Sequence, residues 1–279
     1  MRVKIIVDST VDMIPNLKDK VKAVPLSVRF GEEEYQDGVT IDNRTFYERL
    51  ETSETLPTTS QPTPALFGDA FREAVEAGYE VVCITIASRL SGTYQSATIA
   101  AGEFLGKVFV VDSRTAAVGA GVLAAYGLEL AEKGMGGGEI LQELMEQRQK
   151  VRLYFMVDTL EYLKKGGRLS SAVALVGGLL NIKPVLCVDE AGEIKMLTTA
   201  RGMKKAFATL SQEAGKFGGV DPSRPVLLGY TGNSDENLQR YMEEYRGIWP
   251  QNTPATVVGS AIGVHVGPGA VAVSFFSVE

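Results

Sequence analysis

Three short apolar segments near the start of the chain each end in a turn that contains serine or threonine. They span residues 4–7, 81–86 and 108–111, and helical spacing follows over residues 93–105 and 116–133. Strands that alternate with helices in this way are typical of βαβ units and a parallel sheet. Ligands of such sheets bind at the carboxyl ends of the strands. The pattern therefore predicts a parallel α/β domain with its Ser/Thr-rich turns at one ligand-binding edge.

The pattern changes after about residue 150, where strand-like runs become more widely spaced and less regularly interleaved with helices. This change predicts a second, α+β domain, and we place the two domains at residues 1–150 and 151–279. The expected strands are residues 153–157, 182–188, 194–199 and 225–230, and the expected helical segments are residues 160–165, 171–180, 203–217 and 237–245. The apolar run over residues 172–180 fits a core segment or the lining of a tunnel equally well.

The last part of the chain is free of charge, since no Asp, Glu, Lys or Arg occurs over residues 247–278. A stretch of this length raises the question of a membrane span. Glycines, Pro268 and the single histidine of the chain, His265, interrupt it, and it is rich in valine. Two or three buried strands joined by turns therefore fit better than a membrane helix.

Bulk composition narrows the class of protein. The formal net charge of −6 argues against general nucleic-acid binding. Cys83 and Cys187 lie in apolar runs without a metal-binding spacing, which favours buried free thiols in a reducing compartment; the alternative is a disulfide between them.

The apolar part of residues 1–8 is too short for a signal peptide, so we expect a cytoplasmic protein. We expect no cofactor and no metal, because a zinc cluster and nucleotide-binding glycine motifs are missing from the sequence.

The run from Val82 to Ala97 is the strongest candidate for an anion site. A strand ends there in a Ser/Gly turn, and the helix that follows presents free backbone N–H groups and the positive end of its dipole. The hydroxyls of Ser88, Ser91 and Thr93 add donors, so the turn suits a carboxylate or a phosphate. The alternative is that one of these serines only caps the helix.

Three further motifs have both a structural and a functional interpretation. The hydroxyl-rich segment 58–64 is either a capped turn or a loop, made rigid by two prolines, that presents hydroxyls to a ligand. His265, beside a Gly-Pro-Gly turn, is either a hydrogen-bonded core residue or a ligand contact. Residues 164–168 form either a capped helix end or a loop in which Arg168 meets an anion or a partner surface.

Taken together, the motifs resemble the DegV family of bacterial fatty-acid-binding proteins over essentially the whole chain. Each motif alone is weak, but six in the same order are specific. Ala87 departs from the family, which often has serine there. The motifs are Asp8-Ser9-Thr10, Thr59-Ser60-Gln61-Pro62-Thr63, the run from Ser88 to Ala97, Val111-Asp112-Ser113, the run from Leu160 to Arg168, and His265-Val266-Gly267-Pro268-Gly269.

The resemblance implies a fold and a function. It implies an N-terminal parallel-sheet α/β domain and a C-terminal α+β domain with one long-chain fatty acid buried between them. Its carboxylate would be bound by Thr59, Ser91 and the Gly92 backbone, with His265 nearby. The protein would be a non-catalytic carrier that presents the fatty acid to a separate ATP-using fatty acid kinase, which makes an acyl phosphate for phospholipid synthesis. Transient membrane contact is compatible with this role.

The same resemblance assigns a partner-facing surface. Arg168 and Arg201, with Lys204 and Lys205, would face the kinase or the nascent phosphate. Two other functions stay open. Ser91 and His265 would serve a serine-based acyl hydrolase, although the sequence lacks a nucleophile-elbow motif and an obvious orienting acid. A small-metabolite enzyme similar to dihydroxyacetone kinases would need His265 to react covalently with a carbonyl group.

Overall fold

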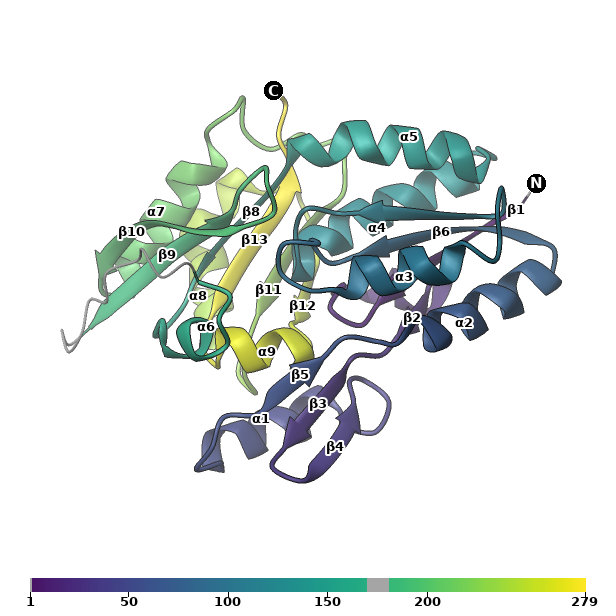
Figure 1. Cartoon of the computed structure of the whole chain (residues 1–279). Coiled ribbons are helices and arrows are strands. Elements are labelled where there is room, and N and C mark those ends of the chain that lie inside the picture. Colours follow the sequence, from purple (N-terminus) through teal and green to yellow (C-terminus); the bar gives the residue numbers. More distant parts are fainter. Residues whose placement is uncertain (1, 170–180) are drawn as a thin grey trace.

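The computed structural model of the chain describes residues 2–169 and 181–279, and these form three sheets with helices around and between them (Figure 1). The expected helical segment 171–180, with the apolar run over residues 172–180, lies outside the described residues. In Figure 1 the two larger sheets lie on opposite sides of the molecule, and the small sheet lies below them.

The first sheet has the strand order β2-β1-β6-β7, and all its pairs are parallel. Successive side chains of β1 point to opposite faces. Ile6 packs against α2 and α3 on one face, whereas Ile5 and Val7 pack toward α4 on the other. The predicted parallel α/β arrangement is confirmed. Its elements are β1 (Arg2–Asp8), β2 (Lys22–Val24), β6 (Tyr79–Thr85), β7 (Val108–Asp112), α2 (Pro64–Glu76), α3 (Thr93–Ala101), α4 (Ala117–Glu132) and α5 (Gly137–Gln147).

The second sheet has the order β10-β9-β8-β13-β11-β12, and every pair except β11-β12 is antiparallel. Helices α7 and α8 cover one face, where Tyr154 and Met156 are buried, and Leu153 and Phe155 are buried on the opposite face. Its elements are β8 (Val151–Met156), β9 (Ile182–Val188), β10 (Ile194–Arg201), β11 (Val226–Tyr230), β12 (Ala255–Val257), β13 (Val271–Phe276), α6 (Glu161–Lys165), α7 (Met203–Ala214) and α8 (Glu236–Tyr245). The expected α+β character is thus confirmed, and the division at residue 150 stays a prediction.

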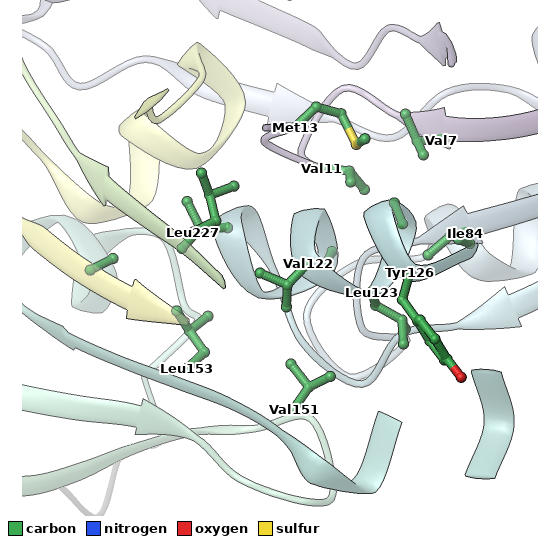
Figure 2. Packing of buried hydrophobic residues seen from close by; sticks show 14 of the residues in the cluster. Val7, Val11, Met13, Ile84, Val122, Leu123, Tyr126, Val151, Leu153 and Leu227 are labelled. Atoms are coloured by element: carbon green, nitrogen blue, oxygen red, sulfur yellow. The ribbon is translucent and has the colours of Figure 1, made fainter. Parts of the chain in front are cut away.

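Helix α4 packs against both large sheets. Figure 2 shows Val122 and Leu123 of α4 between Val7 and Ile84 of the parallel sheet and Leu153 of the second sheet. The helix approaches its neighbours closely because it is rich in small residues. A Cβ at Gly121 would lie only 1.9 Å from the backbone oxygen of Asp12. One continuous apolar core therefore joins the two large sheets.

The third sheet, β4-β3-β5, is antiparallel and was not predicted from the sequence. Its strands are only three or four residues long and mostly polar, so they carry little hydrophobic periodicity. With α1 it packs against α9, burying Val28, Phe46 and Val264 in a shared cluster. These elements are β3 (Ser27–Phe30), β4 (Glu33–Gln36), β5 (Thr58–Ser60), α1 (Asn43–Thr52) and α9 (Ser260–Val266), and three short 3-10 helices are η1 (Pro15–Lys20), η2 (Arg148–Lys150) and η3 (Arg246–Ile248).

The prediction of strands alone in the uncharged tail was wrong. The tail contains β12 and β13, but the segment between them forms helix α9, which carries His265. Valine and glycine are poor helix formers, so local preference does not indicate this helix. Carboxylates from distant segments satisfy its first N–H groups, and sequence spacing does not show such contacts. Among the described residues no helix is long and apolar enough to cross a membrane.

Candidate ligand-binding site

Two carboxylates at strand ends fix the turns at the edge of the parallel sheet. Asp8 accepts hydrogen bonds from the backbone N–H groups of Thr10, at 2.9 Å, and Ile86, at 2.8 Å. Burial raises the pKa of Asp8 to about 6. Asp112 accepts from the Ser88 backbone N–H at 3.1 Å and from the Ser88 hydroxyl at 2.6 Å. Ser88 thus belongs to the turn, which leaves Ser91 as the serine of this motif that lines the cavity described below.

The turn before α3 combines capping with exposure of a hydroxyl to the cavity. Ser91 Oγ lies 2.8 Å from Thr93 Oγ1 and accepts from the Thr93 backbone N–H at 3.3 Å. Gly92 is the N-cap of α3, and a Cβ there would lie 2.1 Å from Gln61 Oε1. Gln61 in turn donates to Ser96 Oγ at 2.9 Å. A larger residue at position 92 would require the Gln61 side chain to move. The hydrogen bond of Gln61 with Ser96 ties the loop after β5 to α3.

Thr59 and His265 meet although 206 positions separate them. Thr59 Oγ1 on β5 lies 2.9 Å from His265 Nε2 in the last turn of α9. The other ring nitrogen, Nδ1, is buried and has no hydrogen-bond partner among the described residues. Burial, with the nearby Arg168 charge, lowers the pKa of His265 to about 4. The imidazole is therefore neutral at pH 7.

Arg168 follows the end of α6, where Gly166 caps the helix and Gly167 has a φ of 70°. Its guanidinium donates to the backbone oxygens of Leu90, at 3.3 Å, and Gly166, at 2.6 Å. Gly166 also packs closely against His265, since a Cβ at position 166 would lie 2.2 Å from His265 Nδ1. The interpretation as a capped helix end is confirmed, because the glycines end the helix. Arg168 lines the cavity, and its contact with an anion or a partner stays a prediction.

The other predicted cations lie elsewhere. Arg201 is exposed at the end of β10, and Lys204 and Lys205 are exposed on α7. None of the three lines the cavity. Any role they have is therefore at the surface of the protein.

A mostly apolar cavity of about 80 Å³ lies where the turns of the parallel sheet approach the second sheet and α9. One water molecule needs only about 10–15 Å³ on this measure. Among the residues that contribute polar side chains to its lining are Thr59, Ser91, Arg168 and His265, and we call these four the polar cluster. The apolar wall includes Leu26, Ile86, Leu90, Ala116, Ala117, Leu153, Phe155, Leu163, Val188, Ile194, Val258, Ala261, Ile262, Val266, Ala270 and Ala272.

Fold and cavity together define an α/β protein with a mostly apolar cavity that carries the polar cluster. The family model described as "Uncharacterised protein, DegV family" matches residues 2–278. The chain belongs to the DegV family. It is 37% identical over 276 residues to a DegV domain-containing protein of Deinococcus radiodurans, covering 98% of each chain. It is 32% identical over 282 residues to protein DegV of Bacillus subtilis, again covering 98% of each.

Solved structures show the same fold. A DegV family protein of Thermus thermophilus, described as binding fatty acid, superposes with a TM-score of 0.88 at 33% identity and covers 100% of both chains. The Streptococcus pneumoniae fatty acid kinase (Fak) B3 protein, loaded with linoleic acid, superposes with a TM-score of 0.86 at 25% identity and covers 99% of each chain.

Sequence reasoning missed the residues that hold the polar cluster in place. Gln61 was part of a recognised motif, but its contact with Gly92 depends on the fold. Asp12 and Asp37 hold the start of α9 and had no visible role in the sequence.

Proposed function

We propose that this protein is a non-catalytic carrier that binds one long-chain fatty acid in the cavity and presents its carboxylate to a separate fatty acid kinase. The observation that carries the proposal is that Thr59, Ser91 and His265 line one cavity whose wall is mostly apolar, with Thr59 in contact with His265. Fatty acids have this division between a polar head and an apolar chain. The fatty-acid-bound relatives support the same ligand class.

The apolar wall would supply most of the affinity. Burial of each methylene contributes about 0.8 kcal/mol, so a chain of roughly fourteen methylenes gains on the order of 11 kcal/mol before ordering costs. Strands of the second sheet provide much of this wall, including Phe155 on β8 and Ala272 opposite it on β13.

The polar cluster would set the orientation of the ligand. The carboxylate would accept hydrogen bonds from the hydroxyls of Thr59 and Ser91 and from the backbone N–H of Gly92. Neutral His265 would lie beside these donors. A buried carboxylate needs several donors to offset its lost hydration. Hydroxyls and one neutral imidazole bind it less strongly than an ion pair would, which suits a carrier that must expose the head group to a kinase. Arg168, the cation of the polar cluster, would be reserved for the nascent phosphate.

Arg168 and Arg201 would have different roles toward the kinase. Arg168 lies at the cavity, so it would approach the nascent acyl phosphate. Arg201 is exposed, so it would contact the kinase surface. We place the transfer in the cytoplasm, with transient contact at the membrane, and we retain the division into domains 1–150 and 151–279.

The geometry disfavours the hydrolase alternative. Ser91 Oγ pairs with Thr93 and His265 Nε2 pairs with Thr59, whereas a hydrolase needs the serine and histidine to pair with each other. Among the described residues, His265 Nδ1 also lacks the carboxylate that would orient a catalytic base.

Lipid extraction and mass spectrometry of the purified, denatured protein test the proposal. We expect one fatty acid per chain, and acyl phosphate formation when ATP and a fatty acid kinase are added. Repeated empty preparations that also fail to bind added oleate and palmitate would contradict fatty acid binding. A loaded protein that no kinase accepts would contradict only the carrier role.

A further inference from the structure

Helix α9 carries His265 in its last turn but has no capping side chain of its own. Its N-cap is Gly259, so partners for the first N–H groups must come from elsewhere. Asp12 Oδ1 accepts from the Gly259 N–H at 2.8 Å. Asp37 Oδ1 and Oδ2 accept from the N–H groups of Ser260, at 3.2 Å, and Ala261, at 3.3 Å. A helix of seven residues is not stable alone, so these carboxylates help to determine where it lies.

Asp37 belongs to the same small sheet as Thr59. It directly follows β4, and its backbone N–H donates to the Leu26 oxygen at 2.9 Å, just before β3. Strand β3 pairs with β5, where Val28 lies opposite Thr59. The sheet therefore holds α9 at both ends, through the Asp37 carboxylate at the first turn and through Thr59 at His265.

Asp12 attaches the start of α9 to the rest of the core. Its backbone N–H donates to the Ala117 oxygen at 3.3 Å, and α4 passes closely over it at Gly121. Asp12 and Asp37 are only 8% and 4% exposed. Burial of two neighbouring carboxylates is costly, and the backbone donors at the positive end of a helix offset that cost.

We propose that Asp37 is a positioning residue for the polar cluster, with Asp12 in a supporting role. By holding the first turn of α9, Asp37 places His265 against Thr59, where the ligand carboxylate is received. This inference rests on the proposed fatty acid binding and adds a residue that does not itself line the cavity.

The two carboxylates predict different mutational effects. Asp37 uses both oxygens as acceptors, whereas Oδ2 of Asp12 has no partner among the described residues. Asparagine has one acceptor oxygen, so it can replace Asp12 but cannot reproduce both contacts of Asp37. Asp42 offers a control, because it also caps a helix, but its hydrogen bond is to the Thr45 N–H of α1, at 2.7 Å.

The experiment compares palmitic acid with hexadecanol, which has the same chain and a neutral head. For Asp37→Asn we expect about tenfold weaker binding of the acid and a change within about twofold for the alcohol. Asp12→Asn and Asp42→Ala should leave both affinities within about twofold of the unsubstituted protein. An unchanged acid affinity in Asp37→Asn, or equal losses for both ligands, would overturn the positioning role.

A ligand-free measurement separates this inference from the proposed function. The chain has one histidine, so the His265 ring resonances are assigned without ambiguity. We expect the chemical shifts of the His265 ring to change in Asp37→Asn and to remain unchanged in Asp12→Asn and Asp42→Ala. Unmoved resonances in Asp37→Asn would overturn the positioning role, whereas failure of the unsubstituted protein to bind either lipid would overturn the proposed function.

Discussion

The apolar wall and the polar cluster line the same cavity but are built differently. Leu153, Phe155 and Ala272 project from neighbouring strands of one sheet, so regular backbone pairing fixes their positions. Thr59 and His265 come from a three-residue strand and a seven-residue helix that need distant contacts to hold them. We therefore expect changes in the wall to alter affinity for any long chain, and changes in the cluster to alter discrimination between head groups.

The largest expected effect comes from filling the cavity at Ala272. Ala272→Leu places three extra carbons opposite Phe155, in the space proposed for the ligand chain. We expect fatty acid binding to weaken by about 100-fold or more, measured by titration calorimetry, because the lost chain contacts contribute about 0.8 kcal/mol per methylene.

Ala272→Gly is the control for this change. Glycine in a central strand lowers stability by roughly 0.5–1 kcal/mol but leaves the cavity open. Ala272→Gly should therefore retain most of the fatty acid affinity of the unsubstituted protein. Equal affinities for Ala272→Leu and the unsubstituted protein would place the ligand outside this cavity.

Acidification tests the polar cluster through His265. The pKa of His265 is lowered from 6.5 to about 4 by burial, so between these values the unfolded chain binds a proton that the folded chain excludes. The neutral, buried histidine therefore causes no loss of stability above pH 6.5. As the pH falls from 6.5 toward 4, the free energy of unfolding decreases by up to about 3 kcal/mol. Urea unfolding should therefore show a weaker decline with acid in His265→Gln than in the unsubstituted protein.

Other groups also titrate in this range, and Asp8, with its pKa raised to about 6, acts in the opposite direction. The comparison with His265→Gln isolates the histidine from them. Direct titration of the ring resonances gives a second check. We expect a midpoint near 4 without ligand and a higher one with fatty acid, since a neighbouring carboxylate favours imidazolium. A midpoint near 6.5 in the ligand-free protein would contradict the buried, neutral histidine.

Removal of one hydroxyl from the polar cluster should have a smaller effect. Thr59→Val keeps the side-chain shape but loses the contact with His265 Nε2. We expect about tenfold weaker binding of palmitic acid and little change for hexadecanol, because a hydrogen bond to a charged group is worth roughly 1.5 kcal/mol. Thr59→Ser should restore acid binding. Equal losses for both lipids would mean that Thr59 supports the wall rather than the head group.

The same contrast explains what the sequence could predict. The strands behind the wall contain apolar runs such as residues 81–86, 153–157 and 182–188, and their pattern alone indicated a parallel sheet and a second, mixed domain. The resemblance assigned Thr59, Ser91 and His265 to one site, and spacing over 206 positions does not reveal the contact of Thr59 with His265. Helix α9 and the small sheet were missed because long-range contacts such as those of Asp37, rather than local preference, stabilise them.

The smallest expected effect on binding is at Arg201, and it separates the carrier role from ligand binding. Arg201 is exposed and does not line the cavity, so Arg201→Ala should leave fatty acid affinity within about twofold. Arg168→Ala should weaken binding as well, because Arg168 lines the cavity and bridges Leu90 and Gly166. If Arg201 faces the kinase, acyl phosphate formation falls in Arg201→Ala while affinity does not. Unchanged formation in that variant would remove Arg201 from the partner surface and leave Arg168 as the proposed contact with the phosphate.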